Sequence, residues 1–304
     1  MGDQVARGQG VTVPAPAGLE PSRRGAISAF FAPKRRIRLT LLLGPPMVWL
    51  VVVYLGAIVA LLVSAFWSVD SFTENVVHQF STANLHTVVT EPIYRTVAVR
   101  TILVAVAVTA IDAVIAFPMA FYMSVVASPR MRRFLVVAVL TPLWASYLVK
   151  AYAWRTLFAP NGPMSWATGG HTPGYGLTAT VVTLAYMWLP YMVIPVYAGF
   201  DRLPRSLFEA SADLGGNAWR TVRSVVVPLL FPAIAAGSIF TFSLTLGDYI
   251  AVGIVGGKTQ LIANVISDQV TLNQPLAAAV SLIPLTAIVL YLAAMRRTGA
   301  LENV

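Results

Sequence analysis

The sequence predicts an all-α integral membrane protein with six transmembrane helices, and three observations lead to this fold class. Hydrophobic residues make up 57% of the 304 positions, charged residues make up 11%, and the mean hydropathy is +0.74. Soluble domains carry roughly a quarter charged residues. Several apolar runs also reach the roughly 20 residues that are needed to cross a hydrocarbon core of about 30 Å. These properties exclude an ordinary soluble fold.

The first 38 residues are expected to form a basic, mostly disordered cytoplasmic tail. The segment is rich in Gly, Pro and Ala, lacks a sustained hydrophobic period, and ends in a basic run from Lys34 to Arg38. A cleaved signal peptide is the competing interpretation. The polar stretch is too long for one, and the run from Leu41 to Ser64 is long enough to span a membrane. We therefore expect an uncleaved first helix.

Five further apolar segments follow, separated by Pro, Gly or charged residues. They run roughly from Val97 to Val126, Phe134 to Leu157, Thr178 to Phe200, Leu229 to Val255 and Leu276 to Met295. Residues 39–296 are thus predicted to form a six-helix transmembrane domain, and residues 297–304 a short cytoplasmic tail.

The distribution of basic residues predicts the orientation. Sixteen of the 21 lysine and arginine residues fall in the tails and the loops on the same side of the membrane. The positive-inside rule then puts both termini in the cytoplasm. This topology accounts for the net charge of +9, so nucleic acid is not expected as a partner. The absence of cysteine excludes disulfides and thiolate metal sites, and no metal site is predicted.

The longest internal loop between spans, residues 201–228, carries specific local signals. Ser206 and Glu209 have the spacing of a capping box, which predicts a short helix from Ser206. Gly215 can supply a left-handed stop, Asn217 suits the N-cap of a second short helix, and Pro228 is expected to end that helix. The pattern indicates a helix–turn–helix on the cytoplasmic face that suits docking of another protein. A plain membrane-surface hairpin is the alternative.

The same loop resembles a known family motif. Glu209-Ala210-Ser211, then Gly215, then Val225, Val227 and Pro228 match in spacing the EAA loop of binding-protein-dependent ABC transporter permeases. Ser211 replaces the second alanine of the usual pattern, and valines replace Ile and Leu. In that family the loop forms coupling helices that fit a groove on the ATPase subunit. The resemblance implies an ATPase-coupling role for Ser206, Glu209, Ala210, Ser211, Asp213, Leu214, Gly215, Asn217 and Pro228.

The resemblance extends over residues 40–295 and is strongest to the spermidine/putrescine class of importer permeases. The matching stretches are Thr141-Pro142-Leu143-Trp144 with Lys150-Ala151-Tyr152-Ala153-Trp154, Leu189-Pro190-Tyr191-Met192-Val193-Ile194-Pro195, and Leu246-Gly247-Asp248-Tyr249 with Gly256-Gly257. It implies the type I permease fold of ABC importers and a permease subunit that translocates a polyamine. The alternative within the same class is another organic ion or an iron chelate.

The resemblance also implies the assembly and its location. The expected partners are an ATPase dimer, a second permease in a heterodimer, an extracellular or periplasmic solute-binding protein, and membrane lipid. The expected location is the plasma (inner) membrane of a prokaryote. No cofactor is expected in this chain, because ATP and Mg would be bound by the ATPase. Gly256-Gly257-Lys258-Thr259 superficially resembles a phosphate loop, but Val252 stands where that motif needs glycine.

Two acidic residues within predicted spans are candidates for the substrate pathway. Asp248 is expected about 28 Å along the fifth span, near the outer boundary, where it could receive a cation. Asp112 lies about 22 Å into the second span and must face protein or water. A plain boundary residue or a helix–helix hydrogen bond is the alternative for Asp248, and structural pairing is the alternative for Asp112.

Aromatic residues are expected near the outer ends of the spans. They are Tyr152, Trp154, Trp188, Tyr191 and Tyr249. Of these, Trp154, Tyr191 and Tyr249 are taken as pathway candidates, because aromatic rings can stack on a cation. An interfacial aromatic belt is the competing interpretation.

Two other functional classes share the hydrophobic composition. A membrane enzyme needs catalytic groups, yet the three histidines, His78, His86 and His171, fall in outside loops without metal-ligand spacing. No catalytic residues are therefore assigned. An ion-coupled transporter does not need the capped loop between the fourth and fifth spans.

Overall fold

A computed structural model of the chain describes residues 35–70, 73, 75–204 and 206–298. Of the tails expected at residues 1–38 and 297–304, residues 1–34 and 299–304 lie outside these described residues, whereas residues 35–38 and Arg297 belong to helices. The chain divides into two units, residues 1–59 and 60–304, and each is treated by itself.

The described part of the first unit is helical. The first helix consists of α2 (Arg35–Leu50), a π-helical turn η1 (Val51–Leu55) and the start of α3 (Gly56–Ser64). Pro45 and Pro46 lie inside α2. Proline removes a backbone donor, and the π turn η1 begins five residues after Pro46.

A small hairpin and a short helix begin the second unit. Strand β1 (Ser68–Val69) pairs antiparallel with β2 (Val76–Val77), with Ser68 opposite Val77. Helix α4 (Ala83–Thr90) follows, and the amide of Asn84 donates to the carbonyl of Trp67 at 2.8 Å. The sequence pattern predicted none of these elements.

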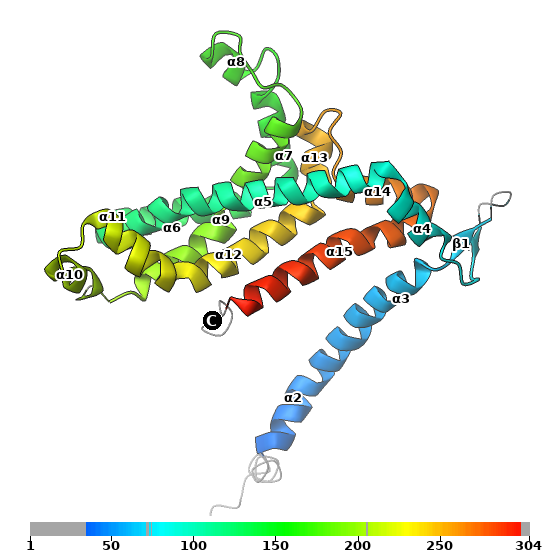
Figure 1. Ribbon diagram of the computed structural model, residues 1–304, viewed down its shortest axis with the longest axis horizontal. Coiled ribbons are helices and arrows are strands. Elements are labelled where there is room, and N and C mark those ends of the chain that lie inside the picture. The colour runs from blue at the N-terminus through cyan, green and yellow to red at the C-terminus, as the bar shows by residue number, and fades with distance from the viewer. Residues whose placement is uncertain (1–34, 71–72, 74, 205, 299–304) are drawn as a thin grey trace, which may run out of the picture. The chain divides into compact units, whose positions relative to one another are not determined.

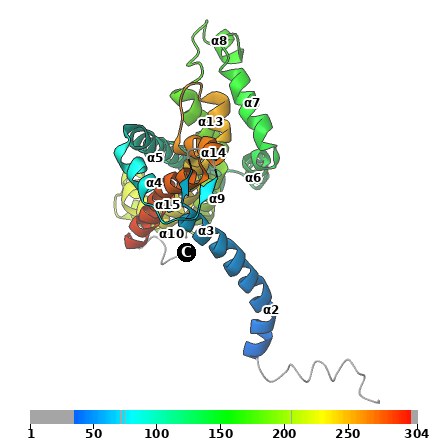
Figure 2. The ribbon, with the colours of Figure 1, turned by 90° about the vertical axis from the view of Figure 1, so that its right-hand side faces the viewer.

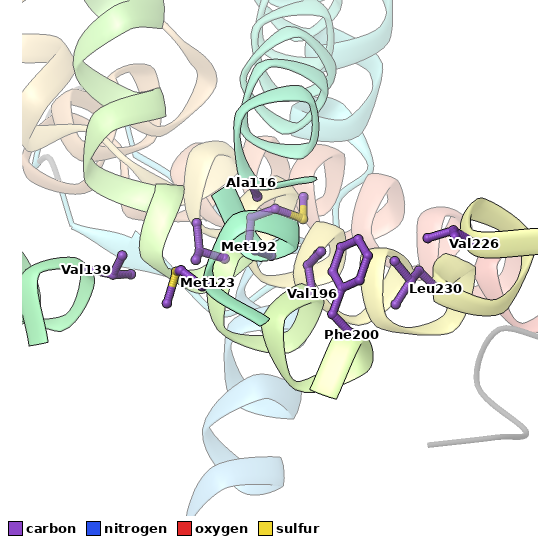
Figure 3. Packing of buried hydrophobic residues seen from close by; sticks show 10 residues of the cluster. Ala116, Met123, Val139, Met192, Val196, Phe200, Val226 and Leu230 are labelled. Carbon is purple, nitrogen blue, oxygen red and sulfur yellow. The ribbon is translucent and has the colours of Figure 1, made fainter. Parts of the chain in front are cut away.

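Three long helices form the centre of the second unit. They are α5 (Pro92–Phe121) with the π turn η2 (Tyr122–Val126), α9 (Leu177–Asp201) and α12 (Val227–Gly247), and each packs against the other two (Figure 1). Their main apolar cluster is shown in Figure 3 and comprises Ala116, Ala120, Met123, Val139, Met192, Val193, Val196, Phe200, Val226 and Leu230.

Two glycines let α9 and α12 approach closely. A Cβ atom at position 199 would lie 2.7 Å from Cβ of Ala233, and one at position 237 would lie 2.7 Å from Sδ of Met192. Small residues at helix contacts are typical of membrane bundles, where association depends on close packing.

Helix starts follow local capping chemistry. Ser128 caps α6 (Pro129–Trp144) by accepting from the N–H of Met131, and Asn273 caps α15 (Gln274–Arg297) by accepting from the N–H of Leu276. Both helices also carry proline in the first turn, where the missing N–H costs no helical hydrogen bond.

Two spans that the sequence predicted as continuous are broken. The predicted third span forms α6 and α7 (Tyr147–Leu157), which are bent by 96° (Figure 2). The predicted fifth span ends as α12 at Gly247, and a separate short helix α13 (Ile250–Val255) follows. Apolar length alone predicted these spans, and it contains no information about a bend.

The remaining helices are α8 (Pro163–Ala167), α10 (Ser206–Asp213), α11 (Ala218–Thr221) with the π turn η3 (Val222–Val226), and α14 (Ile262–Leu272). Within the described residues, five helices are long and apolar enough to cross a membrane, or six if the bent pair α6–α7 is one span. The prediction of an all-α bundle with six spans is confirmed on that count.

Candidate functional site

The break between α6 and α7 is held by backbone geometry and by one lysine. Ala145 and Ser146 are extended, with ψ of 142° and 134°. Pro142 cannot donate a backbone hydrogen bond, which weakens the last turn of α6. The Lys150 ammonium donates to the carbonyl of Pro142 at 3.1 Å. A cation therefore meets a free carbonyl at the end of α6, where the helix dipole favours positive charge.

Asp248 forms the break between α12 and α13. Its backbone is extended, with φ of −82° and ψ of 114°. Its Oδ1 accepts from the N–H of Ala251 at 2.9 Å, which satisfies a donor in the first turn of α13. A carboxylate at this end of a helix is also favoured by the helix dipole.

The two breaks meet at one pair of side chains. The Tyr147 hydroxyl, at the first residue of α7, donates to Oδ2 of Asp248. The N–H of Ala251 lies 3.2 Å from the same hydroxyl oxygen and donates to it as well. Residues 101 positions apart thus join the third and fifth spans.

A pocket of about 270 Å³ opens beside this pair. Its lining residues come from α7, α9, α12 and α13 and are Tyr147, Trp188, Ser243, Leu244, Gly247, Asp248, Tyr249 and Ile250. Asp248 is 7% exposed, so its carboxylate is largely withdrawn from solvent.

Aromatic rings extend from the pocket along α9. Tyr147 and Trp188 have centroids 6.2 Å apart, Trp188 and Tyr191 have centroids 6.0 Å apart, and Tyr191 stacks on Phe240 at 6.4 Å. Ring faces next to a carboxylate form an environment that can hold a cation. The indole N–H of Trp188 is buried and has no hydrogen-bond partner within the described residues.

The structure brings some of the predicted pathway residues together and separates others. Asp248 and Tyr249 line the pocket, and Tyr191 lies one ring beyond Trp188. Trp154 lies elsewhere and packs against Phe158 and Tyr186. Among the residues predicted for this pathway, two of the five are therefore outside the pocket and its row of rings.

Asp112 is the second predicted residue that lies outside the pocket. It is fully buried in α5, and neither carboxylate oxygen has a hydrogen-bond partner within the described part of the chain. The pairing expected from the sequence is therefore not observed. The described residues also contain no group of three or more His, Asp or Glu side chains placed to hold a metal ion.

The sequence pattern did not identify Tyr147 as a lining residue. The position of Tyr147 depends on the bend after α6. Pro142, five residues earlier, was the available signal, since proline often ends a helix within a turn.

The internal loop forms the expected hairpin of two short helices. Helix α10 begins at Ser206, as predicted, and Gly215 has a φ of +74°, which favours glycine. The N–H of Gly216 donates to the carbonyl of Ser211 at 2.8 Å, a closing bond typical of helix C-termini. Asn217 caps α11 by accepting from the N–H of Arg220 at 2.8 Å.

Contacts between the two arms fix the hairpin. The hydroxyls of Ser211 and Thr221 lie 2.7 Å apart and share a hydrogen bond. Phe208 packs against the main apolar cluster. At the turn, Leu214 is 87% exposed and Trp219 is 71% exposed. Residues 206–221 thus present exposed apolar side chains at the turn between two helices that are fixed to each other. We call this segment the coupling hairpin, after the family motif that its sequence resembles.

Two details of the predicted hairpin are wrong. Pro228 does not end the second helix, because α11, η3 and α12 run on as one helix from Ala218 to Gly247. In the π turn the N–H of Val227 bonds to the carbonyl of Val222, so the helix has already shifted its hydrogen-bond register before proline enters.

The capping box at the start of α10 is the second wrong detail. Within the described residues no hydrogen bond joins Ser206 and Glu209. The first turn is instead closed by the N–H of Leu207, which donates to the carbonyl of Pro204 at 3.2 Å.

The described residues form a helical bundle in which five helices are long and apolar enough to cross a membrane, or six if α6 and α7 form one span, and this bundle has the type I fold of ABC importer permeases. The chain belongs to the family described as "Binding-protein-dependent transport system inner membrane component", whose profile matches residues 113–299. The match includes the coupling hairpin, Tyr147 and Asp248. The family is one of transport permeases of the inner membrane and not of enzymes.

Similar proteins carry related names. The chain is 42% identical over 304 residues to the inner membrane ABC transporter permease protein YdcU of Escherichia coli (strain K12), covering 93% of this chain and 97% of YdcU. It is 29% identical over 201 residues to the spermidine/putrescine transport system permease protein PotB of Haemophilus influenzae, covering 63% of this chain and 70% of PotB.

Solved structures share the fold. A bacterial ABC transporter involved in the import of the acidic polysaccharide alginate has a TM-score of 0.61 at 17% identity, over 86% of this chain and 96% of that chain. The MetNI methionine ABC transporter, in inward facing conformations, has a TM-score of 0.56 at 18% identity, over 69% of this chain and 97% of that chain. At these identities the likeness shows the fold alone.

Proposed function

We propose that this chain is the permease subunit of an ATP-driven importer for a polyamine, and that the coupling hairpin transmits the work of a partner ATPase to the spans. The hairpin is the observation that carries the proposal. It is a fixed pair of short helices with an exposed apolar tip at Leu214 and Trp219. Its second arm continues without interruption into α12, so a push on the tip would move a whole span.

The docking role extends to the residues that shape the hairpin. Glu209, Asp213 and Asn217 are exposed and offer polar contacts around the apolar tip. Ser211 and Gly215 fix the angle between the arms, through a hydrogen bond and a positive φ. An exposed apolar centre with a polar rim is the usual composition of a protein interface.

The partners follow from this role. The assembly would hold an ATPase dimer that binds ATP and Mg, a second permease similar to but distinct from this one, and an external solute-binding protein. One of the solved relatives is an alginate transporter in complex with a ligand-bound periplasmic protein. The domain arrangement would be cytoplasmic tails at residues 1–38 and 297–304 around a permease domain at residues 39–296.

The orientation of the termini can be tested directly, because the chain contains no cysteine. In the permease expressed without its ATPase, a single cysteine at Trp219 should react with an impermeant maleimide only in inverted vesicles, whereas one at Trp166 should react only in intact spheroplasts. Both side chains are highly exposed. The opposite pattern would overturn the assignment of the termini to the cytoplasm.

A polyamine substrate is supported by two observations. PotB, at 29% identity, is named as a spermidine/putrescine permease. The pocket beside Asp248 also combines a carboxylate with the rings of Tyr147, Trp188 and Tyr249, which suits an ammonium group. Another organic ion or an iron chelate is the alternative within the same importer class, since the name of YdcU specifies no solute.

Gly215→Val tests the coupling role. A residue other than glycine in the left-handed region costs about 1–2 kcal/mol, and a β-branched residue costs more, so the turn should change shape. Gly174→Val is the matched control. Gly174 has a φ of +64° against +74° for Gly215, and neither position has an atom within 4 Å of an added Cβ. The control lies outside the coupling hairpin.

The assay is ATP hydrolysis and solute uptake by the assembled transporter in proteoliposomes, with the loaded binding protein present. Gly215→Val should lose the hydrolysis that the binding protein stimulates, and uptake with it, whereas Gly174→Val should keep both. Wild-type stimulated hydrolysis in Gly215→Val would refute the docking role.

The solute is tested in the same proteoliposomes with labelled spermidine and putrescine. Uptake that requires ATP and the binding protein supports the polyamine proposal. Absence of polyamine uptake, with uptake of another organic ion or a ferric chelate, would replace the solute while leaving the importer class intact.

A further inference from the structure

Helix α7 is attached to both ends of α13. At its first residue, the Tyr147 hydroxyl bonds Asp248 and receives the N–H of Ala251. In its last turn, Nη1 of Arg155 donates to the carbonyl of Ile254 at 2.9 Å. This guanidinium lies at the C-terminal end of α13, where carbonyls lack helical partners and the dipole favours a cation. Both ends of the short helix are therefore held by one neighbour.

Apolar packing fills the space between these two attachments. Ala151 of α7 and Ala251 and Val252 of α13 are buried in a single cluster, each at most 1% exposed. Alanine on both sides lets the backbones approach closely. The two helices thus form one packed unit, and a shift of α7 must carry α13 and Asp248 with it.

Helix α7 is also attached to α6, the first half of the broken third span. The Lys150 ammonium bonds the carbonyl of Pro142 across the break, one turn after Tyr147. A chain of polar contacts therefore runs from the end of α6, through α7, to the carboxylate that lines the pocket.

Tyr147 holds one oxygen of the Asp248 carboxylate by a hydrogen bond. Oδ1 of Asp248 is fixed by the N–H of Ala251, and Oδ2 is fixed by the Tyr147 hydroxyl. With both oxygens bonded, the carboxylate plane has a single orientation relative to the pocket. Loss of one bond would leave the plane free to turn, and misplaced functional groups lose much of their effect.

We propose that Tyr147 is a positioning residue that holds the Asp248 carboxylate toward the pocket and so determines how efficiently a cationic solute passes. The inference rests on the proposed function of this pocket. Tyr147 acts through Asp248, so its contribution exists only while the carboxylate is present.

The test compares four variants of the complete transporter in proteoliposomes: Tyr147→Phe, Asp248→Asn, the double variant, and Tyr152→Phe as control. Tyr152 is on the same helix, is 55% exposed, and its hydroxyl makes no hydrogen bond within the described residues. Labelled spermidine uptake and ATP hydrolysis are measured together over a range of loaded binding protein. The ratio of solute imported to ATP hydrolysed separates passage of solute from damage to the fold.

Tyr147→Phe should lower the solute imported per ATP by roughly tenfold, the effect of losing one hydrogen bond to a charged group. The half-saturating concentration of binding protein and the stimulated hydrolysis should stay unchanged, and Tyr152→Phe should match wild type. In the double variant the ratio should equal that of Asp248→Asn alone, because residues in one network are not additive.

The other outcomes overturn the inference in distinguishable ways. If Asp248→Asn transports like wild type, the pathway role of the pocket fails and the positioning role fails with it. If Asp248→Asn is impaired but Tyr147→Phe is not, the pocket stands and only the role of Tyr147 is rejected. If hydrolysis and uptake fall in parallel in Tyr147→Phe, or if the two changes are additive, Tyr147 is a structural residue only.

Discussion

Replacing Gly237 by alanine tests how closely α9 and α12 must approach. An added Cβ would lie 2.7 Å from Sδ of Met192, 3.1 Å from Cα of Met192 and 3.1 Å from Cγ of Pro195. Met192 is fully buried, so its sulfur cannot move into open space. The contact with the Met192 backbone cannot relax unless α9 itself shifts. The substitution therefore forces the two helices apart.

The magnitude follows from two opposing terms. Overpacking a filled interior costs about 1–3 kcal/mol. Alanine is more favourable than glycine inside a helix by about 0.5–1 kcal/mol. The middle of each range gives a net destabilisation of about 1 kcal/mol, which corresponds to a fall in melting temperature of roughly 2–4 °C for a domain of roughly 150–250 residues.

The assay is thermal unfolding of the purified permease, followed as loss of the monodisperse peak in fluorescence-detected size-exclusion chromatography. Gly247→Ala is the matched control in the same helix, because no atom lies within 4 Å of a Cβ added there. It should leave the melting temperature unchanged or raise it. If Gly237→Ala is as stable as the control, the close approach of α9 and α12 at this point is refuted.

Two further predictions concern the ends of the coupling hairpin and of α9. The side chains of Arg132 and Asp201 form an ion pair and are 33% and 52% exposed, respectively. A double-mutant cycle with Arg132→Ala and Asp201→Ala, measured by thermal unfolding, should therefore give a coupling free energy below about 1 kcal/mol. A coupling free energy of several kcal/mol would contradict this prediction. Asn217→Ala removes the N-cap of α11 and should lower the local stability of that helix by about 1 kcal/mol. The backbone amides of α11 should therefore exchange roughly fivefold faster in hydrogen–deuterium exchange. Asn217→Asp keeps a capping side chain and should exchange at nearly the wild-type rate. Equal exchange in the alanine variant would show that the cap does not stabilise this turn.

The six spans could be predicted because a membrane-length apolar run is a strong signal. The bends could not, because the runs around Ser146 and Asp248 remain apolar on both sides. A run of apolar residues has the same hydropathy whether it is straight or folded back. Proline at 142 was a partial signal, but several other span prolines lie in unbroken helices, including Pro190 and Pro232.

The turn and the cap of the coupling hairpin were predicted correctly, whereas the continuation of its second helix into α12 was not. The turn at Gly215 and the cap at Asn217 depend on backbone conformation and on neighbours three residues away, which the sequence shows directly. Pro228 was taken as a helix end. The π turn η3 lies just before Pro228, and the helix continues through the proline.

The pocket shows why a charged residue within a span is easier to identify from the sequence than the residues that contact it. Asp248 was identified because a carboxylate in an apolar run is costly and needs a reason. Its partner Tyr147 was not identified, since the contact joins residues 101 positions apart and exists only because α7 turns away from α6. Asp112, selected by the same argument, is buried away from the pocket without a partner in the described structure.

A polar residue in a broken span can satisfy a backbone donor at the break, or it can interact with the solute. Asp248 is placed to do both. Breaking a helix in a membrane leaves backbone donors that must be satisfied, and Asp248 satisfies one of them at Ala251. The same carboxylate faces the pocket, where only its charge would matter to a cation. Asparagine can still accept the Ala251 hydrogen bond, whereas alanine cannot. Asp248→Asn therefore removes the charge and keeps the break, and a loss of transport in that variant, without a loss of stimulated hydrolysis, assigns the effect to the pocket and not to the fold.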